Sequence, residues 1–306
     1  MAQTHPVSPV GPLFLGAPVW ACKAWIGRYW PEATRPHKLL AAYSRHFNTV
    51  EGNSTFYGLP SLATARRWAE EAAPGFRFCL KFPRDISHRG NFALTRRETV
   101  EFQRVLDLLT RAGVAGPAFL QLPPGFSAGE LPALEGYLDQ LSPEFPFAVE
   151  PRHRSWFDAG PHEGALQEAL HRRQISWALF DSRALYSLPP RDDMEATAQT
   201  RKPRTPWRTT TTTNTPFLRW VGRNRSEETE PWLRDWATQI AIWIAEGKEP
   251  YVFVHAPDDA LAPPLAHLFH TLIREAAPQL PALPNFPLDG PASPDPAPRQ
   301  LGLFSG

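Results

Sequence analysis

The sequence contains little cysteine, no long apolar run and almost no net charge, and each shortage excludes a class of protein. Two cysteines in 306 residues, Cys22 and Cys79, cannot build a disulfide framework and suit a reducing compartment. No stretch approaches the ~20 apolar residues of a membrane span, and residues 1–12 lack the charged and apolar regions of a signal peptide. The net charge of +1 creates no overall field for nucleic acid or membrane. We therefore expect a cytoplasmic monomer without membrane contact.

Several catalytic signatures are missing as well. The chain has no P-loop and no Gly-x-Ser-x-Gly elbow, which argues against P-loop nucleotide hydrolysis and against serine-dependent acyl transfer. No Gly-rich turn follows the first candidate strand, residues 13–16, so an open doubly wound dinucleotide-binding sheet lacks support. Hydrophobic residues make up 42% of the chain, which is enough for one sizeable core.

Short apolar runs alternate with longer amphipathic segments over most of the chain. The candidate strands are residues 13–16, 49–51, 76–81, 118–121, 147–150, 176–181, 217–222 and 251–255. Helical spacing of apolar residues recurs between them, with Ser61 and Thr95 as candidate N-caps of two of the helices. Eight such repeats predict a parallel sheet covered by helices, and eight units close into a (β/α)8 TIM-type barrel. The sequence therefore predicts one α/β barrel domain over residues 13–277.

Three segments fall outside this repeat. Residues 1–12 form an N-terminal extension. Residues 187–216 contain the basic run Arg201-Lys202-Pro203-Arg204 and five consecutive threonines but few apolar residues. They are predicted to be a disordered insertion after the sixth strand. Residues 278–306 are rich in proline and are predicted to form an extended tail.

Polar side chains stand at or just after the carboxyl ends of most candidate strands. In a (β/α)8 barrel these ends meet at one mouth, where the chemistry of such enzymes is built. One polar loop residue is usually just solvated, but charged groups that converge on one mouth must be paired, solvated or functional. The candidate catalytic residues are Glu51, Lys81, His88, Glu150, His153 and Asp181. The candidate substrate-binding residues are Trp20, Asn53, Tyr57, Arg84, Gln121, Arg152, Trp156, Arg219, His255 and Asp258.

These residue types favour acid–base chemistry on an anionic substrate. Glu51 and Glu150 could divide the acid and base roles if their surroundings separate their pKa values. Arginine and lysine bind phosphate or carboxylate groups, and histidine moves protons near neutral pH. The set indicates hydrolysis or isomerisation of a phosphorylated or sugar-like substrate. Salt bridges such as Lys81 to Glu51 would instead be purely structural.

A metal site is the alternative reading of the same mouth. Its glutamate, aspartate and histidine side chains are zinc-ligand types, as in barrel nucleases of the endonuclease-four kind. However, no local spacing such as His-Glu-x-x-His occurs, and the nearby lysines and arginines disfavour a cluster of cations. We expect no cofactor and no tightly bound metal, and the sequence leaves a divalent metal open.

Long motifs in the first half of the chain resemble a known family. Residues 47–57 keep a Glu-x-Asn core at Glu51 and Asn53, and residues 148–156 read Ala-Val-Glu-Pro-Arg-His-Arg-Ser-Trp. Residues 25–31, 76–88 and 121–124 carry further matches. Together they are similar to the YecE-like family (domain of unknown function 72), over roughly residues 16–274. The resemblance implies a (β/α)8 barrel whose activity is unsettled.

The chain departs from the family pattern at three strand ends. The family's first strand usually ends Gly-Thr-Ser-Gly-Trp, but residues 17–19 here are Ala-Pro-Val. The histidine expected after Arg219 is Val221, and the eighth strand carries His255 where the family usually has asparagine. His255 could replace the histidine lost at Val221, and the family's chemistry need not transfer whole.

The end of the tail resembles a docking peptide. Gln300-Leu-Gly-Leu-Phe304 is similar to the pentapeptide by which bacterial polymerases and repair proteins bind the DNA sliding clamp. Leu301, Leu303 and Phe304 would fill an apolar groove, Gln300 would hydrogen-bond at its rim, and the Pro-rich spacer would supply reach. The alternative is an ordinary unstructured tail.

Three functions remain open at this stage. The first is a hydrolase acting on a phosphoester or nucleic-acid-related substrate, tethered to the sliding clamp. The second is a sugar or sugar-phosphate isomerase or hydrolase. The third is a non-catalytic, nucleic-acid-associated binding module that uses the mouth as a pocket and the tail as a tether.

Overall fold

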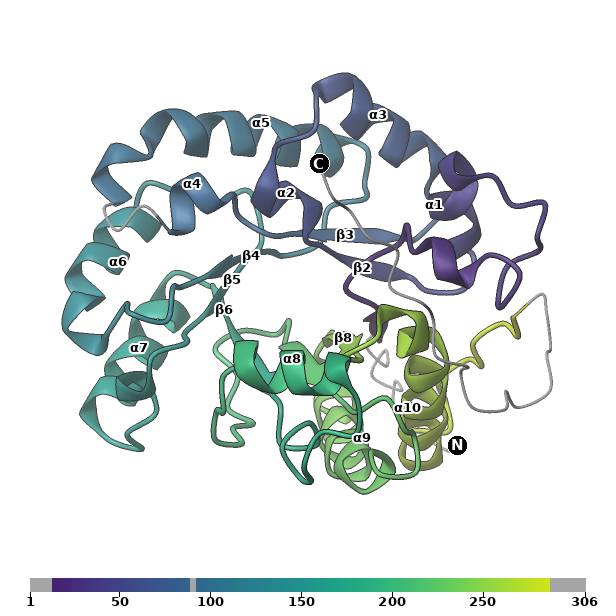
Figure 1. Ribbon diagram of the computed structural model, residues 1–306. Helices are drawn as coiled ribbons and strands as arrows, with labels where there is room; N and C mark the ends of the chain where they lie inside the picture. The colour runs from purple at the N-terminus through teal and green to yellow at the C-terminus, as the bar shows by residue number, and fades with distance from the viewer. Residues whose placement is uncertain (1–12, 89–91, 287–306) are drawn as a thin grey trace, which may run out of the picture.

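The computed structural model describes residues 13–88 and 92–286 and contains parallel strands with helices packed around them (Figure 1). The strands are β1 (Phe14–Gly16), β2 (Thr49–Gly52), β3 (Arg77–Leu80), β4 (Ala118–Gln121), β5 (Phe147–Glu150), β6 (Ser176–Asp181), β7 (Phe217–Val221) and β8 (Tyr251–His255). All eight predicted strands are thereby confirmed. In the described part of the chain, no helix has both the length and the apolar composition needed to cross a bilayer.

Helices follow the strands in the predicted alternation. They are α1 (Leu39–Tyr43), α2 (Ser54–Tyr57), α3 (Leu62–Glu71), α4 (Arg84–Ser87), α5 (Arg96–Arg111), α6 (Leu131–Leu138), α7 (Pro161–Arg172), α8 (Asp193–Arg201), α9 (Glu230–Ala245) and α10 (Ala262–Ala276). The Ser61 hydroxyl accepts the backbone N–H of Thr64 at 3.1 Å and caps α3, as predicted. Thr95 precedes α5, but its hydroxyl donates to the Phe92 carbonyl and makes no cap.

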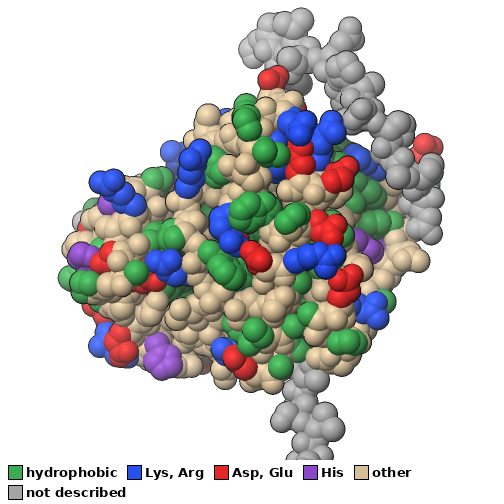
Figure 2. All heavy atoms as spheres, turned by 90° about the horizontal axis from the view of Figure 1, so that it is seen from below, with side chains coloured by type: hydrophobic (Ala, Val, Ile, Leu, Met, Phe, Trp, Pro, Cys, Tyr) green, Lys and Arg blue, Asp and Glu red, His purple; other side chains and the backbone are tan. Residues whose placement is uncertain are grey.

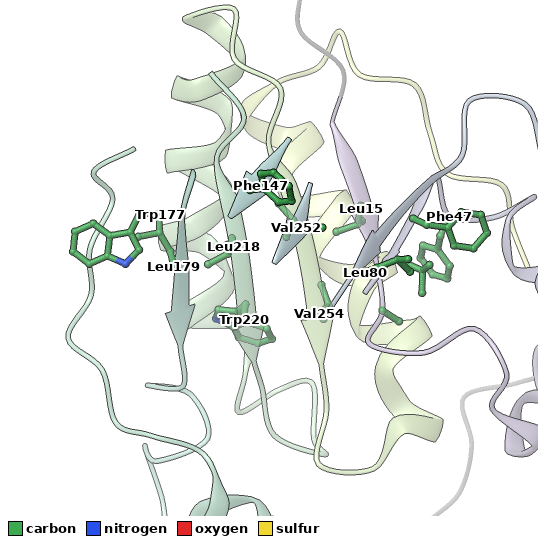
Figure 3. Close-up of a cluster of buried hydrophobic side chains, with 14 of the residues drawn as sticks. Leu15, Phe47, Leu80, Phe147, Trp177, Leu179, Leu218, Trp220, Val252 and Val254 are labelled. Carbon is green, nitrogen blue, oxygen red and sulfur yellow. The ribbon is translucent and has the colours of Figure 1, made fainter. Parts of the chain in front are cut away.

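The strand side chains divide into two sets because successive residues point to opposite faces. One set, which includes Leu15, Leu218 and Val252, packs with the helices in the main apolar core (Figure 3). The other set lies inside the curve of the strands and forms a smaller cluster. Its members are Phe14, Cys79, Phe119, Ala148, Ala178, Phe217, Tyr251 and Phe253. This inner cluster forms the apolar base on which the polar strand ends stand.

The closed (β/α)8 TIM-type barrel that we predicted is wrong. The strands form an open, six-stranded parallel half-barrel sheet in the order β1-β8-β7-β6-β5-β4, and β2 and β3 form a separate pair. Two seams therefore interrupt the ring, one between β1 and β2 and the other between β3 and β4.

Side chains occupy the first seam. Asn48 accepts the N–H of Leu15 at 2.8 Å and donates to the Leu13 carbonyl at 2.7 Å. The Tyr43 hydroxyl accepts the N–H of Ala17 at 2.7 Å and donates to the Thr49 carbonyl at 3.0 Å. These side chains use backbone groups that a continuous β1–β2 ladder would pair, so the two strands are bridged without forming a sheet.

The second seam contains an irregular stretch of backbone. Only isolated bridges, Phe78 to Ala115 and Lys81 to Phe119, join β3 to the start of β4 in the described chain. From one bridge to the next, the chain advances three residues on the β3 side, from Phe78 to Lys81, and four on the β4 side, from Ala115 to Phe119. The β4 side therefore has one extra residue, as in a β-bulge. Pro117 lies within the longer side and has no N–H to donate.

The disordered insertion that we predicted over residues 187–216 is also wrong. Helix α8 forms inside it, and the part of the segment that follows the helix is tied to β6 by threonine side chains. The Thr205 hydroxyl donates to the Phe180 carbonyl at 2.5 Å, and the Trp177 N–H donates to Thr212 at 2.8 Å. The polar composition that suggested disorder instead supplies these hydrogen bonds.

The ends of the chain bear on two further predictions. Residues 281–286 have no regular secondary structure, and the Phe286 ring packs 4.2 Å from that of His267 on α10. The N-terminal extension, residues 1–12, and the docking peptide at Gln300–Phe304 lie outside the described residues.

Candidate functional site

A layer of polar side chains lies directly above the inner apolar cluster, at the carboxyl ends of the strands. Strand alternation explains it: two residues beyond an inward apolar side chain, the chain points inward again. Cys79 is thus followed by Lys81, Phe119 by Gln121 and Phe217 by Arg219. The inward polar layer consists of Glu51, Lys81, Gln121, Glu150, Arg219 and His255, and all six residues are buried.

Arg219 joins the two carboxylates of this layer. Its guanidinium donates to both oxygens of Glu51, from Nε at 2.7 Å and from Nη2 at 2.6 Å. Its Nη1 donates to Glu150. The guanidinium also lies 5.0 Å from the ring centroid of Phe119 and 5.6 Å from that of Phe180. Glu51 and Glu150, 99 positions apart in the chain, therefore share one cation.

This pairing determines the protonation of both acids. Burial alone would raise the pKa of Glu51, but Arg219 and the hydrogen bond from His255 hold that pKa well below its ordinary value. The same balance, with Arg152 assisting Arg219, lowers the pKa of Glu150. Both carboxylates are ionised at neutral pH, so neither carries a proton to donate as a general acid.

Lys81 and Gln121 extend the network toward the cleft. Glu150 accepts from Gln121 Nε2 at 2.8 Å, and Gln121 Oε1 accepts from Lys81 Nζ at 2.9 Å. The Lys81 amine also lies 4.0 Å from the centroid of the Phe56 ring. Burial, followed by the positive charge of Arg219, lowers the pKa of Lys81 to about 8.

His255 lies at the end of β8 and contributes an imidazole to the layer. It pairs in register with Val221 of β7, and its Nε2 lies 3.0 Å from Glu51 Oε2. Burial lowers the pKa of His255 to about 4, so the ring is neutral at pH 7. Nε2 must then carry the ring proton, because Glu51 is an ionised acceptor. The imidazole is thus a neutral donor that helps to orient Glu51.

An open cleft of about 840 Å³ lies over the polar layer. Asn53, Phe56 and Tyr57 form one wall, and residues of α8 face it from the other side. The cationic side chains lining the cleft are Lys81, Arg152, Arg201, Lys202 and Arg219, and the carboxylates are Asp193 and Asp259. Burial, followed by the charge of Arg219, lowers the pKa of Lys202 to about 8.

A buried ion pair holds α8 in place. Glu195 of α8 accepts from Arg223, which follows β7, at 2.6 Å, and both side chains are almost completely buried. Arg223 also donates to the carbonyls of Leu188 and Pro189, at 3.0 and 2.9 Å. Asp192 caps the helix by accepting the N–H of Glu195 at 2.7 Å. Polar contacts therefore place Arg201 and Lys202 over the cleft.

The structure brings together ten of the sixteen predicted catalytic and substrate-binding residues. Asn53, Tyr57, Lys81, Gln121, Arg152, Arg219 and His255 line the cleft. Glu150 lies beneath them, in contact with Gln121 and Arg219. Glu51 lines an adjoining pocket of about 240 Å³, together with Trp20.

The remaining predicted residues do not line the cleft, although the His88 ring meets that of Phe56 edge to face at 5.1 Å. Asp181 points outward and accepts from Trp236 of α9 at 2.6 Å, and Trp156 is buried and donates to the Phe126 carbonyl. Asp258 accepts the N–H of Ala260 at 2.9 Å. His88 and His153 bond to the neighbouring Ser87 and Ser155, each at 2.8 Å. These residues and Arg84 are absent from the cleft lining.

Sequence reasoning missed several residues that line the cleft. Phe56 and Phe180 are apolar and carried no signal of a site. Met194, Thr197, Arg201 and Lys202 belong to the segment predicted to be disordered. The basic run at residues 201–204 was the available signal for the last two. Asp259 lines the cleft in place of its neighbour Asp258.

Two observations concern charge and possible metal ligands over the described residues. On the face shown in Figure 2, acidic and basic side chains are interspersed. Within residues 13–88 and 92–286, no three histidine, cysteine, aspartate or glutamate side chains come together as a metal-binding group.

Comparison with known proteins identifies the family. The family model described as "Protein of unknown function DUF72" matches residues 14–288. The UPF0759 protein YecE of Escherichia coli K12 is 34% identical over 279 residues, covering 90% of this chain and 97% of that protein. The UPF0759 protein YunF of Bacillus subtilis is 28% identical over 142 residues, covering 45% of this chain and 50% of that protein.

Solved structures of the same family share the fold. The DUF72 protein TM1631 of Thermotoga maritima aligns with a TM-score of 0.64 at 21% identity, covering 86% of this chain and 99% of that one. The DUF72 protein EF0366 of Enterococcus faecalis aligns with a TM-score of 0.65 at 15% identity, covering 92% and 100%. The resemblance seen in the sequence is confirmed, and this chain belongs to the DUF72 family of proteins of unknown function.

Proposed function

We propose that the chain is an enzyme that binds the phosphate of a phosphoester in the cleft and hydrolyses the ester. The observation that carries this proposal is a group of cations without carboxylate partners. In the described part of the chain, no carboxylate lies within ion-pairing distance of Lys81, Arg201 or Lys202. Lys81 is buried and Lys202 is half-buried, and the charge of Arg219 opposes the charge of both, a cost that a bound dianion relieves.

The cations also suit the reaction itself. Phosphoryl transfer depends mainly on positioning and on stabilising the negative charge of the transferred group, which pre-arranged lysine and arginine side chains supply. Arg152 Nε is buried and has no hydrogen-bond partner in the described structure, which leaves a donor available. The carboxylates Glu51 and Glu150 then serve to hold Arg219 rather than to exchange protons.

Lys81 is the candidate proton donor to the leaving oxygen. With a pKa of about 8 it is mostly protonated at pH 7, and it is more acidic than an ordinary lysine. Burial raises the pKa of Asp259, so this carboxylate is a stronger base and could accept a proton from the attacking water. Water then adds to phosphorus, and the alcohol leaves with the Lys81 proton.

Phosphate binding is expected to weaken as the pH rises through about 8. Lys81 and Lys202 carry their charges below that pH and lose them above it, while a phosphoester stays a dianion. Losing one charge-assisted contact costs about 1.5–3 kcal/mol, or roughly 10- to 100-fold in affinity. Titration calorimetry with glycerol 2-phosphate at pH 7 and pH 10 measures this difference.

Matched variants make the same test specific. Lys202→Met is expected to weaken glycerol 2-phosphate binding at pH 7 and to reduce the pH dependence. Lys248→Met is the control, because Lys248 pairs with Glu246 outside the cleft. An affinity that stays constant from pH 7 to pH 10, or no binding at all, would contradict the proposed site. Binding without any phosphate release from a panel of phosphoesters would favour a non-catalytic binding module.

A tether to the DNA sliding clamp remains part of the proposal. It rests on Gln300, Leu301, Leu303 and Phe304 alone, because these residues lie outside the described structure. A clamp-bound enzyme would meet nucleic-acid phosphoesters at high local concentration.

A further inference from the structure

Two apolar side chains are exposed at the edge of the cleft. Tyr57 at the end of α2 is 84% exposed, and Met194 near the start of α8 is 47% exposed. Single exposed apolar residues are normal on protein surfaces and need no explanation. These two, however, line the same cleft.

The two side chains come from opposite walls. In Figure 1, α2 and α8 lie on opposite sides of the opening at the centre of the strands. Both helices are fixed beneath their exposed residues. Thr55 of α2 donates to the Lys81 carbonyl at 2.6 Å, and Glu195 of α8 pairs with Arg223. Tyr57 and Met194 are therefore presented to the cleft by rigid supports.

A continuous series of contacts links Tyr57 to the cations in the cleft. The Lys81 amine lies 4.0 Å from the Phe56 ring centroid, and the Phe56 and Tyr57 rings meet edge to face at 5.2 Å. Only the Phe56 side chain would thus separate a phosphate bound by Lys81 from Tyr57. The group esterified to that phosphate would extend along Phe56 toward the edge of the cleft.

From this arrangement we infer that the cleft has a second subsite, which binds a flat aromatic group carried by the phosphoester. Tyr57 stacks on one face of the ring, and the thioether of Met194 packs against the ring from the opposite wall. The inference rests on the proposed function, since the phosphate anchors the ring. It names the substrate class as an aryl or heteroaryl phosphoester rather than a phosphorylated aliphatic alcohol.

The test compares two phosphoesters that carry the same charge. Phenyl phosphate and glycerol 2-phosphate are titrated by calorimetry into the full chain at pH 7. Phenyl phosphate is expected to bind at least about tenfold more tightly, because only its ring can occupy the second subsite. Tyr57→Ala is expected to remove that difference, by lowering the affinity for phenyl phosphate far more than the affinity for glycerol 2-phosphate.

The remaining variants separate a subsite from a general change in structure. Tyr57→Phe keeps the ring and is expected to keep the preference, and Met194→Ala is expected to reduce it. Ile242→Ala on α9, an exposed apolar residue outside the cleft, is the control and is expected to change neither affinity. Equal affinities in the wild type, or equal losses for both probes in Tyr57→Ala, overturn the second subsite. Failure of both probes to bind overturns the proposed phosphate site as well.

Discussion

Replacing Arg219 with methionine is expected to lower the free energy of unfolding by about 3–5 kcal/mol, the cost of breaking a buried ion pair. Glu51 and Glu150 would remain buried with their shared cation gone. Urea unfolding, monitored by tryptophan fluorescence, measures the loss. Arg234→Met is the control, because Arg234 pairs with Glu230 on the exposed face of α9, where ion pairs contribute about 0–1 kcal/mol.

The pH dependence of this loss has a definite sign. In the wild type the pKa values of Glu51 and Glu150 are lowered, so these groups stabilise the fold above the unfolded value of about 4.3. That stabilisation disappears as the pH falls through the folded pKa values. Without Arg219, burial would raise both pKa values, so both acids would bind protons more readily in the folded variant than in its unfolded chain. The difference in the free energy of unfolding between the wild type and Arg219→Met is therefore expected to be smaller at pH 5 than at pH 7.

A triple variant keeps this prediction testable if Arg219→Met does not fold. Adding Glu51→Gln and Glu150→Gln removes the uncompensated charges and is expected to restore most of the lost stability. A single variant as stable as the wild type, or a triple variant no better than the single one, would show that the three groups are not coupled as the distances indicate.

Replacing Arg223 with methionine is expected to release α8 from the rest of the molecule. Glu195, which is buried, would lose its cation, and the Arg223 to Glu228 pair at 2.9 Å would be lost as well. A cost of about 3–5 kcal/mol follows from leaving a buried carboxylate unpaired. Because the helix packs few apolar groups, we expect this loss of stability to open α8 locally rather than to unfold the whole protein. Faster tryptic cleavage after Arg201 and Arg204 would measure this opening.

Two further results would show how far α8 shapes the cleft. Glycerol 2-phosphate affinity is expected to fall in Arg223→Met, since Arg201 and Lys202 would no longer be held over the cleft. Arg191→Met is the matched control: it also removes a partner of Glu228, but Arg191 is half exposed. Unchanged cleavage and unchanged affinity in Arg223→Met would mean that other contacts position the helix.

Much of the site could be predicted because strand alternation is local. Once β3, β4 and β7 are recognised, Lys81, Gln121 and Arg219 fall on the inward face two residues beyond Cys79, Phe119 and Phe217. The same rule, applied strictly, would have excluded Asp181. It follows the inward Phe180 by one residue, and a shift of one residue turns a side chain to the opposite face.

The errors arose where side chains distant in sequence decide the outcome. Asn48 and Tyr43 take backbone groups of β1 and so interrupt the ring, although the pattern of strands predicted closure. Helix α8 has few apolar residues and is held instead by the charge of Arg223, which lies 28 positions from its partner Glu195. Composition cannot distinguish such a segment from a disordered one, since both are polar.

The amino-acid sequence by itself determined the eight strands, their inward polar ends and membership of the family, because each depends on residues a few positions apart. Only the tertiary structure decided that the sheet is open, that both carboxylates are bound to Arg219, and that α8 closes one side of the cleft. The physical reason is the same in each case. Arg219 contacts Glu51 across 168 positions, and such a pairing depends on how the whole chain packs rather than on any local pattern.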